Sequence, residues 1–171
     1  IAKQRKALDE NGAIFIESTG TYLSDQHRKM TAEIERGAQA FDLKERLTKI
    51  TLINDVIDLG NAIRLDVWKA QADNDFSHFK KAQDNVPKIS SLLEQIRKIT
   101  TQDVDLAELD HIKKATENYS TAMGNLLSAF QDMEELSKLR NDAGEQVLAA
   151  SRAVAAAGLE HTGEIADQTV S

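Results

Sequence analysis

The sequence lacks cysteine, contains a single proline and has few aromatic residues. Without cysteine, disulfides, thiolate nucleophiles and sulfur-ligated metal sites are excluded. One proline and eight glycines among 171 residues leave little room for a turn-rich β-fold, so we expect an all-α protein. Aromatic side chains usually supply much of the core of a globular domain, and their share of only 5% therefore favours a thin helical bundle.

Basic stripes and long apolar runs are missing as well. The net charge is −7 and acidic and basic residues are interspersed, so we expect no nucleic-acid partner. No run approaches the roughly 18 apolar residues that a membrane span needs. The chain begins at Ile1, with neither an initiator methionine nor a signal peptide, and we therefore expect a soluble piece of a larger protein.

Apolar spacing and end signals predict four helices. Gly37 is a typical residue after a helix C-terminus, and Asp42 with Glu45 has the pattern of a capping box that opens the next helix. Asp105 with Glu108 repeats that pattern. We expect one module, residues 1–171, built as an elongated antiparallel up-down-up-down four-helix bundle with an overlong C-terminal helix. The expected helices cover about 2–36, 42–72, 75–99 and 105–168.

The last helix carries an apolar seam with the coiled-coil period of 3.5 residues. The seam runs from Leu109 to Val154 over more than six heptads. The other helices are too short to cover it beyond about residue 140. We therefore expect a homodimer through the long helices, in which a second copy covers seam residues such as Val147 and Val154.

Residue constellations that could carry catalysis or bind metal are missing from the pattern. The four histidines lie on different predicted elements, and none has a second ligand at a metal-site spacing: His27, His78, His111 and His161. No nucleophile elbow, phosphate loop or dinucleotide fingerprint occurs. We expect no enzyme activity, no catalytic residues, no metal and no cofactor.

Polar residues interrupt the apolar stripe of the second predicted helix. Alternating steps of four and three residues from Leu43, Leu47 and Ile50 lead to Asn54, Asn61, Arg64 and Trp68. A buried guanidinium needs a counter-charge, so an external carboxylate is one expected partner of Arg64. Alternatively, Arg64 extends outward over Trp68 or pairs with a carboxylate of another helix, such as Asp84.

Counting residues from the ends of the four predicted helices places side chains at common levels. Asn54 falls level with Tyr22 and Tyr119, whereas Arg64 falls about ten residues lower, near Gly12. Hydroxyls and amides inside an apolar bundle, with room beside Gly12 and Gly60, predict a small-molecule pocket. The alternative is a polar layer that satisfies itself and fixes the register of the helices.

Two segments carry a resemblance to a known family. Asn61-Ala-Ile-Arg64-Leu-Asp66 and Glu117-Asn118-Tyr119-Ser-Thr-Ala122-Met123 resemble the helical bimodular sensor domain of bacterial methyl-accepting chemotaxis receptors. That family stacks two four-helix bundles on six helices. The resemblance implies that this chain corresponds to the upper half of the long third helix and to the fourth, fifth and sixth helices, which include the membrane-distal bundle.

The resemblance also implies a ligand and a location. The family binds a small carboxylate in the distal bundle, and Arg64 and Tyr119 match positions of that pocket; Asn54, Asn61, Trp68 and Tyr22 are added by the stripe and level arguments above. We expect a periplasmic sensor domain of a chemoreceptor, anchored to the membrane only through segments outside this chain. The sensor domain of a two-component histidine kinase and a purely structural coiled-coil stalk remain alternatives.

Overall fold

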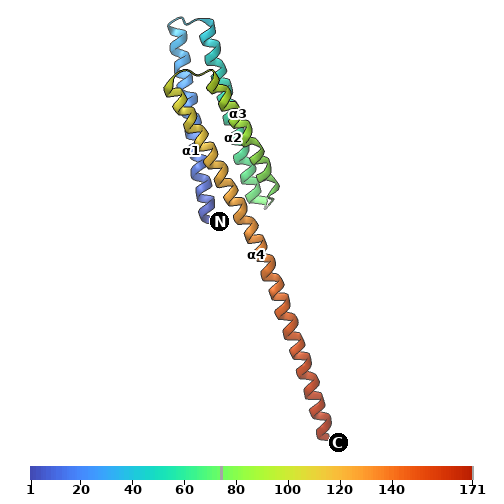
Figure 1. Ribbon diagram of the computed structural model, residues 1–171. Coiled ribbons are helices and arrows are strands. Elements are labelled where there is room, and N and C mark those ends of the chain that lie inside the picture. Colours follow the sequence, from blue (N-terminus) through green and yellow to red (C-terminus); the bar gives the residue numbers. More distant parts are fainter. Residues whose placement is uncertain (74, 171) are drawn as a thin grey trace. The chain divides into compact units, whose positions relative to one another are not determined.

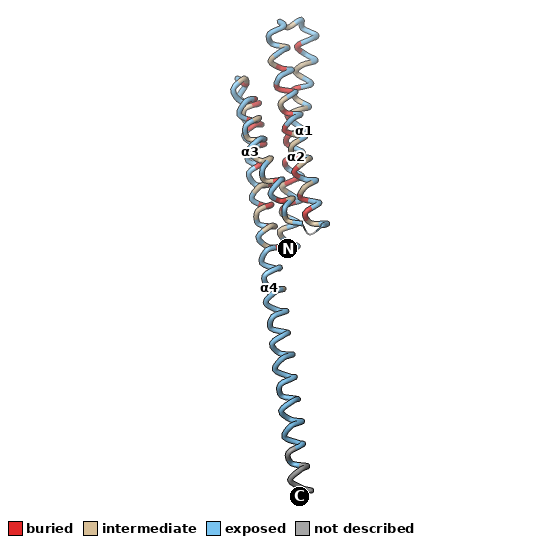
Figure 2. The backbone as a smooth tube through the Cα atoms, turned by 90° about the vertical axis from the view of Figure 1, so that its right-hand side faces the viewer, coloured by how far each residue is buried: buried red, intermediate tan, exposed pale blue. Residues whose placement is uncertain are grey.

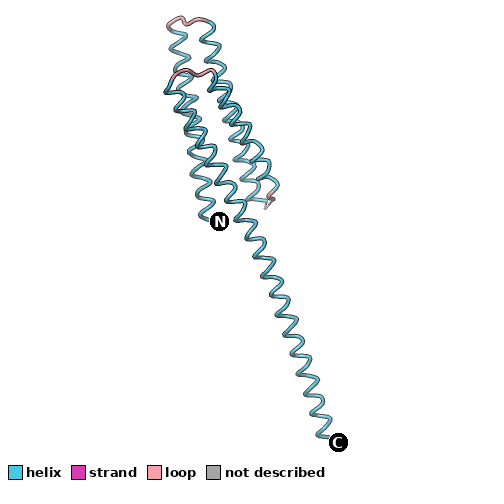
Figure 3. Tube along the Cα trace, in the orientation of Figure 1, coloured by secondary structure: helices cyan, strands magenta, loops and turns pink. Residues whose placement is uncertain are grey.

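The computed structural model describes residues 1–73 and 75–170, except for the side chains of residues 164 and 166–170. Four α-helices make up nearly all of this part of the chain, and none of its residues lies in a strand (Figures 1 and 3). Each helix begins and ends within two residues of the range expected from the sequence. The helices are α1 (Ala2–Glu35), α2 (Ala40–Asp73), α3 (Ser77–Lys98) and α4 (Asp103–Val170).

The chain divides into two compact units, Ile1–Ala129 and Phe130–Ser171. In the first unit α1 packs on α2 and α2 packs on α3. The second unit consists of the C-terminal part of α4, whose described side chains are mostly exposed from residue 131 onward (Figure 2). At 68 residues, α4 is twice as long as α1 or α2, as the long seam predicted. Within the described ranges, no helix is both long enough and apolar enough to span a membrane.

Gly37 ends α1 as the sequence indicates. Its φ of 70° lies in the left-handed region that glycine adopts without steric cost. The Gly37 N–H donates to the carbonyl of Ile34 at 3.0 Å, and the Ala38 N–H donates to that of Glu33 at 2.9 Å. This pair of hydrogen bonds is the Schellman motif, which satisfies carbonyls at a helix end and turns the chain towards α2.

The two predicted capping boxes are wrong. Helix α2 begins at Ala40 and α4 at Asp103, so Asp42 and Asp105 lie inside the first turn of each helix. Asp42 is exposed, whereas Asp105 is fully buried and accepts a hydrogen bond from Gln26 of α1. An acidic residue in the first turn still favours the positive end of the helix dipole, which explains why the sequence signal marked the right region.

The inward face of α2 differs from the stripe expected from the sequence. The expected stripe runs through Asn54, Asn61, Arg64 and Trp68, and all four are exposed. The observed face lies one residue away on the helix. Arg46 and Lys49 are buried at its N-terminal end, and from Ile50 to Ala70 its buried members are apolar residues and one glycine. Burying unpaired amides and a guanidinium is costly, so the apolar neighbouring stripe turns inward instead. Its buried members include Ile53, Val56, Gly60, Ile63, Val67 and Ala70.

Candidate functional site

A groove beside α1 and α2 brings together four of the six predicted site residues. Arg64, Asn61 and Trp68 reach it from α2, and Tyr119 reaches it from α4. Its volume is about 770 Å³, which is within the usual range for small-molecule sites. The lining also includes Leu8, Asp9, Gly12, Ala13, Ile16 and Glu17 of α1 and Leu65, Val67 and Gln71 of α2.

The four predicted residues occupy different depths of the groove. Arg64, Asn61 and Trp68 are exposed, and Trp68 retains 68% of its accessible surface. Tyr119 is buried, with only 5% of its surface exposed. The three α2 residues share one side of the helix because they are spaced by three and four positions. Arg64 therefore lies at an accessible rim and not in the interior of the first unit, so burial does not force a counter-charge on it.

The Arg64 guanidinium is accessible at the rim of the groove. In the described part of the chain, its guanidinium forms neither a hydrogen bond nor an ion pair, and the expected alternative pairing with Asp84 is not observed. It does act on Tyr119: burial raises the pKa of that phenol to about 12, Arg64 opposes the rise and Asp9 adds to it. A positive and a negative side chain thus both lie close enough to Tyr119 to affect it.

The absence of a side chain at Gly12 lets the Tyr119 ring pack against the backbone of α1, and the absence of one at Gly60 lets the Phe15 ring pack against the backbone of α2. A β carbon at Gly12 would lie 3.3 Å from Cε2 of Tyr119, so the ring packs directly on the α1 backbone. At Gly60, the Phe15 ring fills the corresponding space. We expected these glycines to leave room for a ligand, but aromatic rings of the protein occupy the space beside both.

Asn54 and Tyr22, the other two predicted residues, lie outside the groove. Asn54 is exposed, and its side-chain amide donates to the carbonyl of Ile50 at 2.9 Å. Tyr22 is fully buried, and its pKa is raised by burial and then modified by Thr100 and Asp105, which lie near the start of α4. Tyr22 therefore lies near the start of α4, outside the groove that Tyr119 lines.

Counting residues from the helix ends predicted that Tyr119 lies level with Tyr22, and this prediction is wrong. The count assumed that the turn between α1 and α2 lies level with the turn between α3 and α4. Asp105 of α4 meets Gln26 of α1, about ten residues before the end of that helix. Figure 1 shows the turn between α1 and α2 extending beyond the turn between α3 and α4. Tyr119 therefore lies beside Gly12 and not beside Tyr22. Gly12 lines the groove together with Arg64, so Tyr119, which packs on Gly12, lines the groove as well.

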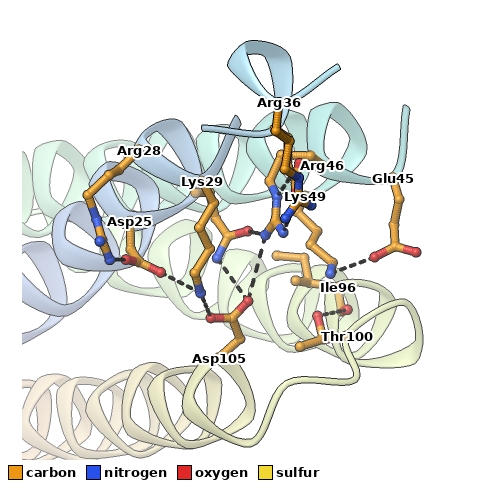
Figure 4. A network of polar contacts seen from close by, with 12 residues as sticks. Asp25, Arg28, Lys29, Arg36, Glu45, Arg46, Lys49, Ile96, Thr100 and Asp105 are labelled. Carbon is orange, nitrogen blue, oxygen red and sulfur yellow. Dashed lines mark hydrogen bonds and ion pairs between the residues drawn. The ribbon is translucent and has the colours of Figure 1, made fainter. Parts of the chain in front are cut away.

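A buried polar network, which the sequence analysis missed, occupies the region where α4 begins (Figure 4). Arg46 donates to both carboxylate oxygens of Glu33, at 3.2 and 2.7 Å, and also to the side-chain carbonyl of Gln26. Asp105 accepts from Gln26 at 3.2 Å and from Lys29. These residues come from α1, α2 and α4, so the network connects three helices of the first unit.

A sequence signal for part of this network existed. Seven-residue steps along α1 from Leu8 lead through Phe15 and Tyr22 to Lys29, and the parallel row from Gly12 leads to Gln26 and Glu33. The buried face of α1 therefore becomes charged towards its C-terminal end. The residues that pair with it could not be found in this way, because Arg46 and Asp105 lie on other helices.

Three carboxylates of this region lie close enough together for their oxygens to surround a cation. One oxygen each of Asp25, Asp105 and Glu108 lies within 4.8 Å of the others. The Lys29 ammonium already contacts Asp25 at 2.7 Å and also contacts Asp105. Glu108 forms no ion pair in the described residues, and its pKa is raised, mainly by burial and then by Asp25 and Asp105. The Lys29 ammonium of the protein itself therefore already pairs with two of the three carboxylates.

His111 lies beside a second cavity. A groove of about 720 Å³ along α1 and the start of α4 is lined by His111, Ser18 and Glu108, among others. Ser18 Oγ donates to the carbonyl of Ile14 at 2.7 Å and lies 3.1 Å from His111 Nδ1. A serine hydroxyl has one proton, so where Ser18 donates it to Ile14 its oxygen can meet the imidazole only as an acceptor.

Comparisons of this chain with protein-family models, with curated proteins and with solved structures each found no match.

Proposed function

We propose that this chain is the extracytoplasmic ligand-sensing domain of a bacterial chemoreceptor and that it binds a small organic acid in the groove beside α1 and α2. One observation carries the proposal: Arg64, Asn61 and Trp68 of α2 and Tyr119 of α4, four of the residues expected from the sequence, line a single cavity. An accessible guanidinium without a partner can bind a carboxylate through two parallel N–H donors. The indole of Trp68 and the amide of Asn61 would contact the rest of the ligand.

The proposed bundle topology is supported by side-chain pairs. Asp105, His111 and Tyr119 follow one another along α4, and they contact Gln26, Ser18 and Gly12 of α1 in that order. The residue numbers therefore fall along α1 as they rise along α4. Contacts whose residue numbers run in opposite directions on two helices show that the helices are antiparallel. Similarly, α3 and α4 pair through Arg97 with Asp110 and through Glu94 with Lys113. We infer an antiparallel up-down-up-down bundle for residues 1–129.

Signalling in this proposal depends on the helix that carries Tyr119. The groove is lined by α1, by α2 and by Tyr119 of α4, so a ligand in it contacts more than one helix. A ligand that binds two arrangements of these helices with different affinity shifts the balance between them. Because α4 is unbroken from Asp103 to Val170, a displacement of its first part has a continuous helix along which to travel.

The proposed setting is the periplasm, with membrane anchors outside this chain and a homodimer through the long helices. The exposed apolar residues of the second unit support the dimer; they include Met133, Leu136, Leu139, Val147, Leu148 and Val154. The same seam favours a structural coiled-coil stalk as a second candidate, for which no ligand is needed. A histidine-kinase sensor domain would use the groove in the same way as a chemoreceptor.

Thermal denaturation with a ligand panel tests the proposal. Acetate, pyruvate, malate, succinate and a set of amino acids are each added at matched ionic strength and pH, with sodium chloride as the control. A ligand specific for the folded state at about a hundred times its Kd adds about 2.7 kcal/mol of stability, which gives a measurable rise in Tm. If no compound raises the Tm above the chloride control, the stalk is favoured and ligand sensing at this groove is rejected.

A further inference from the structure

We infer that the groove selects a ligand carrying both a carboxylate and an ammonium group, as an amino acid does, over a simple organic acid. This inference rests on the proposed function and specifies its ligand. It arises from the charges of the groove, which include those of two acidic residues of α1, Asp9 and Glu17.

The groove lining carries more negative than positive charge. Arg64 contributes one positive charge, and Asp9 and Glu17 contribute two negative charges, which leaves a net charge of −1 among the described lining residues. All three side chains are exposed. In the described part of the chain none of them forms an ion pair, so each is available to a ligand.

A simple organic acid matches only half of this arrangement. Its carboxylate gains from Arg64 but is repelled by Asp9 and Glu17, and a dicarboxylate is repelled more strongly because it brings two negative charges. A zwitterion avoids this repulsion: its carboxylate pairs with Arg64 while its ammonium pairs with a carboxylate of α1. The groove therefore favours a zwitterion over a ligand that carries only carboxylates.

The opposite charges of the groove lie near one residue. Arg64 and Asp9 act with opposite sign on the Tyr119 hydroxyl, so both lie close to Tyr119. The two charged ends of a small zwitterion therefore have partners from α2 and from α1 near the same phenol. Apolar side chains at Ile16, Leu65 and Trp68 provide contacts for an apolar ligand side chain.

Calorimetry with ligands matched in their carbon chain tests the inference. The probes are norvaline and 5-aminopentanoate, which are zwitterions, pentanoate, which lacks the ammonium, and butylamine, which lacks the carboxylate. At neutral pH at least one zwitterion is expected to bind about tenfold or more tightly than both singly charged probes, since one charged hydrogen bond accounts for that ratio.

The possible outcomes separate the inference from the proposed function. If pentanoate binds as tightly as both zwitterions, the inference fails while the proposed acid site stands. If butylamine binds as tightly as the zwitterions, the inference also fails, because the carboxylate makes no contribution. If none of the four probes binds, the inference is overturned, and the thermal panel decides separately whether any acid is bound.

Variants of the acidic residues give the second arm of the test. The double variant Asp9→Asn, Glu17→Gln should weaken binding of the preferred zwitterion about tenfold or more and leave pentanoate binding unchanged or stronger. Asp58→Asn is the matched control, because Asp58 is an exposed carboxylate of α2 outside the groove. Unchanged zwitterion affinity in the double variant, or an equal loss in the control, overturns the inference.

Discussion

The ring of Phe15 on α1 occupies the space in which a side chain at Gly60 of α2 would begin. A β carbon at position 60 would lie 2.8 Å from Cζ of Phe15 and closer still to Cε1. Phe15 is itself buried, with 2% of its surface exposed, so its ring has little freedom to move aside. The close approach of α1 and α2 beside the groove therefore depends on a glycine at this position.

Gly60→Ala is expected to destabilise the protein by about 1–3 kcal/mol, the usual cost of inserting a methyl group into a packed core. Gly124→Ala is the control, because a β carbon at Gly124 meets nothing within 4 Å and alanine is the better helix former. Urea unfolding followed by circular dichroism measures both. A Gly60→Ala variant as stable as the Gly124→Ala variant would contradict the packing described for Phe15.

Arg46→Met is expected to cost about 3–5 kcal/mol, because it removes the guanidinium that hydrogen-bonds to the buried carboxylate of Glu33 and leaves only the exposed Arg36, at 3.8 Å, beside it. The two side chains are 7% and 11% exposed, and their closest ion-pair distance is 2.7 Å. Arg28→Met serves as the control, since the Arg28 side chain is 78% exposed and such pairs contribute about 0–1 kcal/mol. Equal unfolding free energies for the two variants would argue against a buried network.

Glu33 and Glu108 are expected to give opposite pH dependences of stability. The hydrogen bonds from Arg46 lower the pKa of Glu33, so its contribution is present above the ordinary carboxyl pKa of about 4.3 and is lost as the pH falls through the lowered value. Burial first, and then Asp25 and Asp105, raise the pKa of Glu108, so its charge lowers stability as the pH rises above the ordinary value.

The matching variants are Glu33→Gln and Glu108→Gln, measured by unfolding between pH 3 and 8. Glu33→Gln should lower stability at neutral pH, and its effect should shrink at acidic pH. Glu108→Gln should raise stability at neutral pH and have no effect at acidic pH, where both the wild-type carboxyl and the amide are neutral. Destabilisation by Glu108→Gln at neutral pH would show that its charge is compensated.

The exposed seam of the second unit is expected to mediate self-association. Val147 and Val154 are 67% and 74% exposed and are seven residues apart, so they share one helix face. The double variant Val147→Glu, Val154→Glu should weaken dimer formation in sedimentation experiments. Ala149→Glu with Ala156→Glu adds the same charge at the same spacing on the opposite face and should not. A wild-type chain that stays monomeric up to millimolar concentration refutes the prediction.

The helices could be predicted from the sequence because their signals are local. Gly37 needs only its own φ to end α1, and the period of α4 from Leu109 to Leu126 identified residues that are buried. The inward face of α2 was harder to predict, because two stripes lie one residue apart. The stripe through Asn54 and Arg64 has polar residues where its neighbour through Ile53 and Ile63 is apolar, but that neighbour also carries the buried Arg46 and Lys49 near the start of the helix.

The candidate site could be predicted only in part for a related reason. Arg64, Asn61 and Trp68 share a helix face, and spacing alone brings them together. The contribution of Tyr119 depends on how far α4 is displaced along α1, and the contact between Gln26 and Asp105 fixes that displacement. No local pattern encodes a contact between residues so far apart in sequence. The acidic side of the groove was missed because Asp9 and Glu17 are exposed residues outside the apolar pattern of α1.

The measurement that tests the central claim most directly is calorimetry of wild type, Arg64→Ala and Arg64→Lys with the carboxylate that gives the largest rise in Tm. Loss of the charged hydrogen bonds should weaken binding by about ten- to a hundredfold in Arg64→Ala, without a change in helical content. Arg64→Lys should recover only part of the affinity, because an ammonium lacks the planar fork of the guanidinium. Equal affinities for all three proteins would contradict a carboxylate site at Arg64.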